Sequence, residues 1–259
     1  MDDLEFSWPA PLHDFLLGQD EVHVWSFCLA ETEETLAHLE AVLAPEEQIR
    51  AAAFRFDRDR SRYVTGRATL RTILGRYLGA APESIQLTTG PNGKPLLNEA
   101  LAASGLQFNL AHCEDAAILA LTCDRPVGLD IERLRPVEDA EEMAEVFCSP
   151  REFAEFKAVA KSEKDAAFFR IWTRKEALLK ATGAGIGHLL RDVEVSFDTD
   201  AEGRFLKLPK EAGFSAGQWN LRVLQPARGY LAAIAFPGKA GALSCWQWKK
   251  VQATEYEYS

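Results

Sequence analysis

The sequence predicts an α+β fold of two similar lobes related by a pseudo-twofold axis, each with a small, mainly antiparallel sheet packed on a long helix. The main observation is an imperfect internal repeat. Pro45 and Tyr63 match Pro150 and Phe168, both at an offset of 105 residues (150 − 45 and 168 − 63). Both halves also share the order helix, long helix, strands. A repeat of this length is too long for a solenoid, so two lobes are expected, and ligands favour such junctions.

This repeat suggests a division into an N-terminal lobe over residues 1–125, a C-terminal lobe over 126–238, and a C-terminal strand and tail over 239–259. The chain has 259 residues, of which 47% are hydrophobic, so it can bury a substantial core.

Hydrophobic periodicity and turn residues give the elements of the first lobe. A strand buried on both faces is expected at 21–29. Helices are expected at 33–43, from Pro45, and at 57–79, where Gly79 ends the long helix. Strands are expected at 85–88 and 94–97 around an Asn92-Gly93 turn, then at 107–111 and 116–122.

The second lobe repeats this order. A strand carries Asp130, and helices are expected at 138–147, 150–159 and 161–182. Strands follow at 193–197, 219–224 and 231–236, and Trp246 and Trp248 have strand spacing near the C-terminus.

Composition limits the function. Lys and Arg number 29 against 39 Asp and Glu, and the net charge of −10 argues against nucleic acid or anionic membrane as a partner.

The N-terminus lacks the features of a signal peptide and no apolar run reaches membrane-spanning length, so a cytoplasmic protein is expected. The five cysteines are scattered and odd in number, which indicates neither a disulfide framework nor a zinc site.

Two segments carry candidate chemistry. In the strand Val127–Glu132, a period of two puts Asp130 and Glu132 on one side and Ile131 on the other. In the long helix of the second half, Trp172, Glu176 and Lys180 recur at helical spacing. Three carboxylates together suit Mg²⁺, with Mn²⁺ as an alternative. Taken singly, each segment has an ordinary alternative: a solvated strand edge, and an i,i+4 surface pair.

Arginines crowd the first lobe, at positions 50, 55, 58, 60, 62, 67, 71 and 76. Most of them suit a solvated helix face paired with acidic residues. The alternative is a phosphate clamp, because guanidinium offers a rigid, bidentate fork to phosphate oxygens.

Gly128–Glu132 followed by Trp172–Lys180 resembles the motif pair of the surfactin-type (Sfp-like) 4′-phosphopantetheinyl transferases. Arg62-Tyr63 with Gly66, Asn92–Pro95 and Phe108–His112 occur in the family's order. The resemblance implies a monomeric pseudo-dimer that binds coenzyme A between its lobes and needs Mg²⁺. It also implies transfer of the 4′-phosphopantetheine arm to a serine of an apo acyl or peptidyl carrier protein, with release of adenosine 3′,5′-bisphosphate.

The resemblance implies these roles residue by residue. The metal would be held by Asp130, Glu132 and Glu176. The catalytic residues would be Glu176, Lys180 and Asp130, with Glu176 as the base, directly or through a metal-bound water. Coenzyme A would be bound by Arg50, Arg62, Gly93, Lys94, Pro95, His112, Lys175 and Lys180. Arg50, Arg62 and His112 would meet its 3′-phosphate end, Lys94 the adenine through its backbone, and Lys175 and Lys180 the diphosphate. Glu47 stands where the family often has a basic residue, and Ala111 where it commonly has a serine.

Alternatives remain at this stage. His112 shares a strand face with Phe108 and Leu110, so it could be a buried structural histidine. A Mg²⁺-dependent pyrophosphate hydrolase would use the same carboxylates and basic residues, and a non-catalytic module would only hold coenzyme A or a carrier protein. The sequence does not identify whether fatty acid, polyketide or nonribosomal peptide synthesis supplies the carrier.

Overall fold

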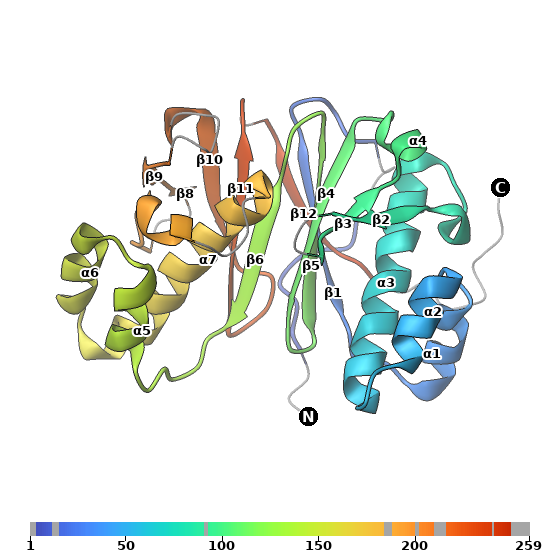
Figure 1. Cartoon of the computed structure of the whole chain (residues 1–259), viewed down its shortest axis with the longest axis horizontal. Coiled ribbons are helices and arrows are strands. Elements are labelled where there is room, and N and C mark those ends of the chain that lie inside the picture. Colours follow the sequence, from blue (N-terminus) through green and yellow to red (C-terminus); the bar gives the residue numbers. More distant parts are fainter. Residues whose placement is uncertain are drawn as a thin grey trace.

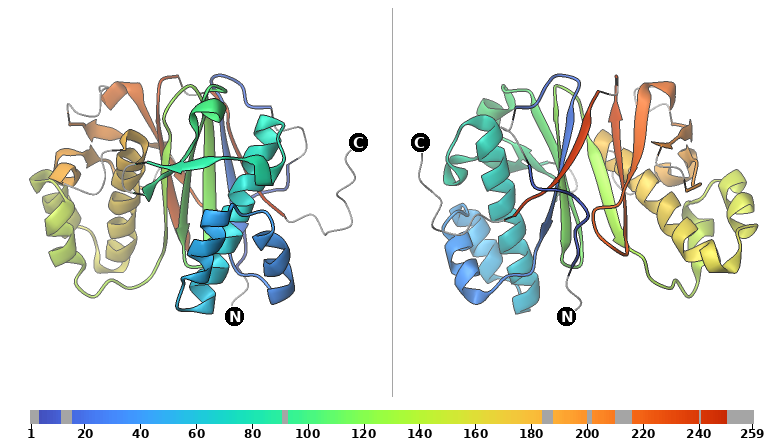
Figure 2. Two further views of the ribbon diagram at one scale, coloured as in Figure 1. Left: turned by 45° about the vertical axis from the view of Figure 1, so that its right-hand side comes forward. Right: turned by 180° about the vertical axis from the view of Figure 1, so that it is seen from behind.

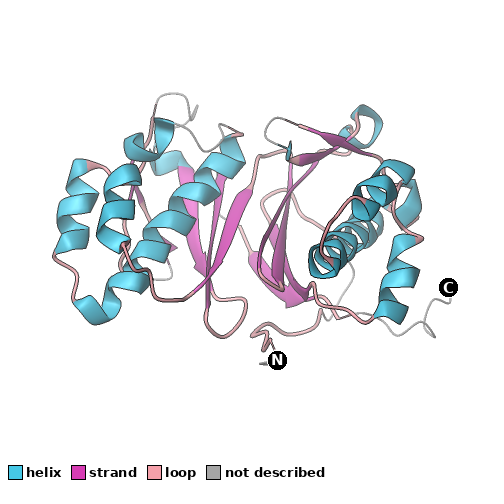
Figure 3. Cartoon of the chain, turned by 60° about the horizontal axis from the view of Figure 1, so that its bottom comes forward, coloured by secondary structure: helices cyan, strands magenta, loops and turns pink. Residues whose placement is uncertain are grey.

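Two four-stranded sheets stand side by side at the centre of the molecule, and helices cover their outer sides (Figures 1 and 3). The computed structural model describes residues 4–11, 16–90, 93–183, 188–199, 202–209, 216–239 and 241–249. Among these residues, no helix is both long enough and apolar enough to span a bilayer.

The first lobe runs from a strand through three helices to a hairpin and two more strands. Its elements are β1 (Val22–Cys28), α1 (Glu33–Glu40), α2 (Pro45–Ala52), α3 (Asp57–Leu78), β2 (Leu87–Thr89), β3 (Pro95–Leu97), α4 (Glu99–Ala102), β4 (Leu106–Cys113) and β5 (Ala116–Cys123). Gly79 ends α3 in the left-handed conformation, with φ of 61°, as predicted.

The second lobe repeats the series. Its elements are β6 (Gly128–Arg133), α5 (Ala140–Phe147), α6 (Pro150–Lys157), α7 (Lys164–Thr182), β7 (Glu194–Val195), β8 (Glu202–Gly203), β9 (Phe205–Lys207), β10 (Trp219–Leu224) and β11 (Tyr230–Pro237). The last strand, β12 (Leu243–Gln247), pairs with β1 of the first lobe. Short 3₁₀ turns lie at Pro82–Ser84, Lys161–Glu163, His188–Asp192 and Ala216–Gln218.

Strand order confirms the predicted pair of similar α+β lobes. The sheets run β12-β1-β5-β4 and β6-β11-β10-β8, so β1, β5 and β4 correspond to β6, β11 and β10. All pairings are antiparallel except β1 with β12. The boundary at 125/126 stays a prediction, because β12 crosses back to join the first sheet and Phe6 pairs with Ala227 of the second lobe.

Several predicted bounds were too long. The first helix ends at Glu40, and α7 begins at Lys164 after a 3₁₀ turn. The strand predicted at 193–197 covers only Glu194–Val195, and the short strands β8 and β9 were not predicted. Most of the C-terminal tail and the Pro91-Asn92 part of the hairpin turn lie outside the described residues.

The two sheets face each other across a shared apolar core. Val24 of β1, Leu129 and Ile131 of β6, and Ile234 of β11 are buried in it. Asn109 of β4 joins the sheets directly, because its Oδ1 accepts a hydrogen bond from the backbone N–H of Leu129 at 2.8 Å. With Leu129 and Ile131 pointing toward the shared core, the alternation of β6 turns the residue between them toward α7.

Gly128 allows β6 to approach α7 closely. A Cβ at this position would lie 2.2 Å from the backbone O of Ala177 and 2.2 Å from the backbone N of Ala181. Backbone atoms cannot move aside as a flexible side chain can. The absence of a side chain at Gly128 therefore sets the separation between the strand and the helix that carry the candidate site.

We expect Gly128→Ala to destabilise the fold by about 2–3 kcal/mol or more, because the added methyl must push α7 away from β6. Urea denaturation measures the loss. Gly217→Ala is the matched control, since a Cβ there meets no described atom within 4 Å. Equal stabilities for Gly128→Ala and the parent chain would show that the close approach is not required.

Candidate active site between the lobes

Asp130 and Glu176 face each other across the contact between β6 and α7. Lys180, one helical turn after Glu176, donates from its Nζ to Asp130 Oδ1 at 2.5 Å. Asp130 and Glu176 are buried, with 6% and 3% exposure. The structure thus brings together the three residues predicted to be catalytic.

One oxygen on each carboxylate is buried without a partner among the described residues, namely Asp130 Oδ2 and Glu176 Oε1. An unpartnered buried carboxylate oxygen is costly, and it calls for a cation or a donor that arrives with a ligand. Hard oxygen donors of this kind fit Mg²⁺. The residues present therefore suit the metal that the sequence resemblance implies.

Glu132 lies beside this pair but turns elsewhere. Its Oε2 accepts from Cys113 Sγ at 3.6 Å and lies 3.4 Å from a guanidinium nitrogen of Arg135. Within the described ranges, no three His, Cys, Asp or Glu side chains are grouped so as to hold a metal ion. The predicted three-carboxylate set is therefore not preassembled, and the role of Glu132 stays a prediction.

The surroundings of Asp130 and Glu176 raise the pKa values of both carboxyl groups. Burial, followed by the charge of Asp130, raises the pKa of Glu176 to about 7. Burial also raises the pKa of Asp130, while the Lys180 ammonium opposes that shift. Burial and the mutual repulsion of the two carboxylates therefore both favour the protonated forms, and a bound cation would oppose this shift.

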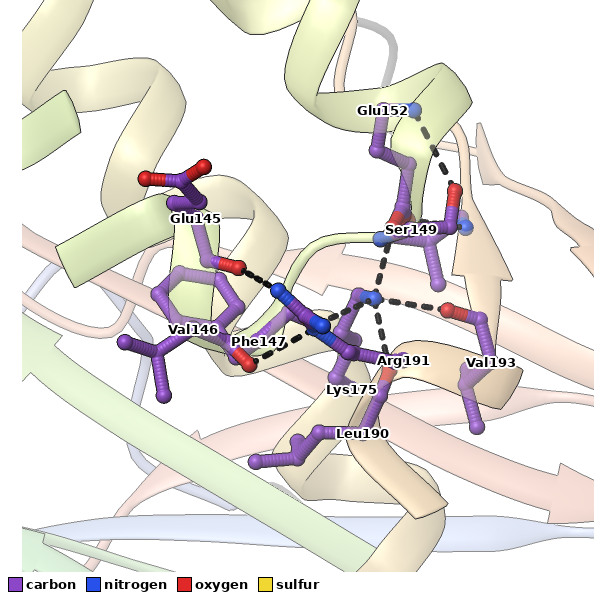
Figure 4. A network of polar contacts seen from close by, with 10 residues as sticks. Glu145, Val146, Phe147, Ser149, Glu152, Lys175, Leu190, Arg191 and Val193 are labelled. Atoms are coloured by element: carbon purple, nitrogen blue, oxygen red, sulfur yellow. Dashed lines mark hydrogen bonds and ion pairs between the residues drawn. The ribbon is translucent and has the colours of Figure 1, made fainter. Parts of the chain in front are cut away.

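Lys175 corrects the sequence prediction. Its amine does not face the diphosphate site but is enclosed in the second lobe, with 0% side-chain exposure. Its Nζ donates to Glu152 Oε2 at 2.6 Å and to the backbone oxygens of Val193 at 2.6 Å, Leu190 at 2.8 Å and Phe147 at 3.0 Å (Figure 4). With these acceptors around it, the amine has no path to a ligand between the lobes.

The first lobe contains the counterpart of this interaction. Glu47 is buried, and its Oε2 accepts from Arg71 Nε at 2.7 Å. Each of the two glutamates also caps its own helix, because Glu47 accepts from the N–H of Ala44 and Glu152 from the N–H of Ser149. Glu47 is thus a structural partner of α3.

A cavity of about 410 Å³ in the first lobe collects most of the residues predicted to bind coenzyme A. Arg50, Arg62, Gly93, Pro95 and His112 all line it. They come from α2, α3, the β2–β3 hairpin and β4.

Two of these residues are set for an anionic ligand. Arg62 donates from its Nε to Asp115 Oδ1 at 2.8 Å, which fixes the guanidinium beside His112. His112 is exposed into the cavity, so it is not a buried structural histidine. Its pKa is lowered by desolvation and then by the charges of Lys180 and Arg62.

Two aromatic residues and a further arginine that line this cavity were not predicted to do so, namely Phe54, Tyr63 and Arg67. Tyr63 lies between Arg50 and Arg67, whose guanidinium carbons are 5.3 and 5.7 Å from the ring centroid, and Phe54 packs beside it. Arg67 was grouped with the solvated arginines, although its i,i+4 spacing from Tyr63 was a usable signal. The stacked arrangement holds two guanidinium groups where a phosphate could meet them.

The second lobe has a similar cavity of about 480 Å³ on its corresponding elements, lined by Arg151, Arg170 and Arg204. Each of these arginines already has a carboxylate partner: Glu155, Glu163 and Asp198, respectively. At the repeat offset, Arg50 and Arg62 correspond to Glu155 and Ala167, which removes two cations. Carboxylate partners do not separate the two cavities, since Arg62 of the first lobe is itself paired with Asp115. The first-lobe cavity differs by the two cations, Arg50 and Arg62, that the second lobe lacks at the corresponding positions.

The buried carboxylates and the arginine- and histidine-lined cavity are chemically suited to a phosphorylated ligand, and comparison with known proteins identifies the family. A family model described as "4'-phosphopantetheinyl transferase superfamily" matches residues 126–235, and one described as "4'-phosphopantetheinyl transferase, N-terminal" matches residues 29–124. The chain belongs to the 4′-phosphopantetheinyl transferase superfamily.

Curated relatives support this assignment. The 4'-phosphopantetheinyl transferase HetI of Nostoc sp. is 36% identical over 245 residues, which cover 95% of this chain and 100% of the relative. The 4'-phosphopantetheinyl transferase Sfp of Bacillus subtilis is 27% identical over 160 residues, which cover 62% of this chain and 69% of Sfp. The crystal structure of Thermotoga maritima holo-[acyl-carrier-protein] synthase aligns with 44% of this chain and 63% of its own, at TM-score 0.35 and 22% identity.

We expect Lys175→Met to cost about 3–5 kcal/mol of stability, because it leaves the Glu152 carboxylate buried and unpaired. Denaturant titration measures this loss. Arg151→Ala is the control: it removes an exposed ion pair with Glu155 from the same helix and should cost at most about 1 kcal/mol. Similar losses for the two variants would mean that the buried pair does not anchor α7.

The contribution of Glu176 to the stability of the metal-free protein should fall as the pH rises from about 4.5 to about 7, the interval between its ordinary and its raised pKa. In this interval the folded chain binds more protons than the unfolded chain, so deprotonation favours unfolding. Urea denaturation in chelator should show that Glu176→Gln removes up to roughly 3 kcal/mol of this pH dependence. Glu46→Gln, an exposed carboxylate on α2, is the control, and an unchanged profile in Glu176→Gln would refute the assignment.

Proposed function

We propose that the chain transfers the 4′-phosphopantetheine arm of coenzyme A to a serine hydroxyl of an apo acyl or peptidyl carrier protein, releasing adenosine 3′,5′-bisphosphate. The observation that carries this proposal is the junction between the lobes. There the buried Asp130–Glu176–Lys180 cluster is linked to the first-lobe cavity, because Lys94, between the lining residues Gly93 and Pro95, donates to the backbone oxygen of Lys180. The net charge of −10 supports a small-molecule and protein substrate rather than nucleic acid or membrane. A cytoplasmic monomer remains part of the proposal.

In this arrangement the 3′-phosphate and adenosine occupy the first-lobe cavity, where Arg50, Arg62 and His112 supply charge-assisted donors. The diphosphate then reaches Lys180, Asp130 and Glu176. Mg²⁺, when bound by Asp130 and Glu176 with Glu132 nearby, would neutralise phosphoryl charge. Binding the adenosine 3′-phosphate on one lobe and the diphosphate on the other orients the diphosphate relative to the incoming serine.

The reaction forms a bond between the serine oxygen and the pantetheine-side phosphorus, and it breaks the bond from that phosphorus to the bridging oxygen. Glu176 accepts the hydroxyl proton as the general base. The leaving adenosine 3′,5′-bisphosphate carries the bridging oxygen away with its electron pair. Lys180 stabilises that developing charge.

The rival activities have less support. A pyrophosphate hydrolase would use the same carboxylates, but the curated relatives HetI and Sfp are both named as transferases. A non-catalytic binding module would have no need for a buried carboxyl group with a pKa near neutral.

The direct test incubates the protein with labelled coenzyme A, Mg²⁺ and a panel of apo carrier proteins, and follows carrier mass and nucleotide release. We expect one adenosine 3′,5′-bisphosphate for each modified carrier. Asp130→Asn and Glu176→Gln should slow transfer at least about 100-fold with the fold intact, whereas Glu155→Gln, an exposed carboxylate, should not. Release of free phosphopantetheine without a carrier would instead indicate the hydrolase.

The adenosine end has its own test. Arg62→Ala should weaken coenzyme A binding about 10- to 100-fold, because it removes a charge-assisted donor to the 3′-phosphate. The affinity for 3′-dephospho-coenzyme A should change much less. Calorimetry measures both, with the exposed Arg58→Ala on the same helix as control. Equal losses for the two ligands would remove Arg62 from the 3′-phosphate site.

A further inference from the structure

Three consecutive residues of the β2–β3 hairpin contact two different parts of the site. Gly93 and Pro95 line the first-lobe cavity. Lys94, between them, extends away to the second lobe, where its Nζ donates to the backbone oxygen of Lys180 at 3.0 Å. In Figure 2 the hairpin crosses from the first lobe toward α7.

The acceptor of this hydrogen bond has an unusual position. Lys180 lies in the last turn of α7, which ends at Thr182, and the final carbonyl groups of a helix have no partner within the helix. A cation at this end also interacts favourably with the helix dipole. Lys94 therefore caps α7 from the opposite lobe.

The same Lys180 presents its own amine to Asp130 at 2.5 Å. Its backbone is thus held by one lysine while its side chain is held by the reactive-site carboxylate. Lys94 is itself half-buried, and burial together with the neighbouring charge of Lys180 lowers its pKa. Two lysine amines consequently stand close together where the two lobes meet.

We propose that Lys94 is a positioning residue: by capping α7 across the lobes, it fixes the Lys180 amine relative to Asp130 and couples occupancy of the first-lobe cavity to the geometry of the reactive centre. This role rests on the proposed transferase function. It is separate from the backbone contact with adenine that the family resemblance implies for the same residue. In this proposal Gly93 and Pro95 contact the ligand in the first-lobe cavity, and the Lys94 side chain links their position to that of α7.

The test compares Lys94→Met, which keeps the aliphatic stem and loses the donor, with Lys94→Arg, which keeps a donor. We expect Lys94→Met to lower kcat about tenfold or more while the KM for coenzyme A changes less than about threefold, since positioning errors act on the chemical step. Lys94→Arg should restore part of kcat. Lys207→Met, an exposed lysine on β9, is the control.

Hydrogen exchange gives a second readout that needs no turnover. In Lys94→Met, amides in the last turn of α7 should exchange faster than in the parent chain, and in Lys207→Met they should not. Unchanged kcat together with unchanged exchange would overturn the role of Lys94, as would a loss confined to KM. If the parent chain transfers nothing, faster exchange in Lys94→Met than in the parent would support the cap and refute only the transferase function.

Discussion

A buried carboxylate–cation pair in each lobe is the interaction on which the rest of the structure depends. Glu47 and Glu152 each occupy the first turn of a short helix that begins with proline, and each binds a cation from the following long helix, Arg71 in α3 and Lys175 in α7. The cation in turn donates to backbone oxygens after that helix, such as Ile85 O in the first lobe. One ion pair thus joins short helix, long helix and the following segment, and removing either partner would leave a buried charge.

This pair sets the rotation of α7 about its axis. Residues of a helix are offset by about 100° each, so a helix that turns Lys175 toward α6 must turn Glu176 away from it. Glu176 and Lys180 then face β6, at the short distance that Gly128 permits. The local stability of the second lobe and the placement of the reactive groups therefore have one physical cause, although Lys175 touches none of those groups.

The internal repeat predicted the two lobes, and periodicity alone predicted the long helices and the alternation that puts Asp130 on the opposite side of its strand from Ile131. It misassigned Lys175, although Lys175 and Glu176 are adjacent and cannot share a helix face. It also did not assign Arg67 or Tyr63 to a cavity, since only the packing of α2 on α3 shows that they line one. The contact of Lys94 with Lys180 spans 86 positions and two lobes, and no local pattern could reveal it.

The most direct measurement uses Mn²⁺ in place of Mg²⁺ and follows the three phosphorus resonances of bound coenzyme A. Mn²⁺ suits the same oxygen ligands and is paramagnetic, so it broadens the nearest phosphorus nuclei most. If the lobes divide the ligand as proposed, the two diphosphate resonances broaden strongly and the 3′-phosphate far less, and Asp130→Asn abolishes the difference. Strongest broadening of the 3′-phosphate, or equal broadening of all three, would contradict the placement of the diphosphate at Asp130 and Glu176.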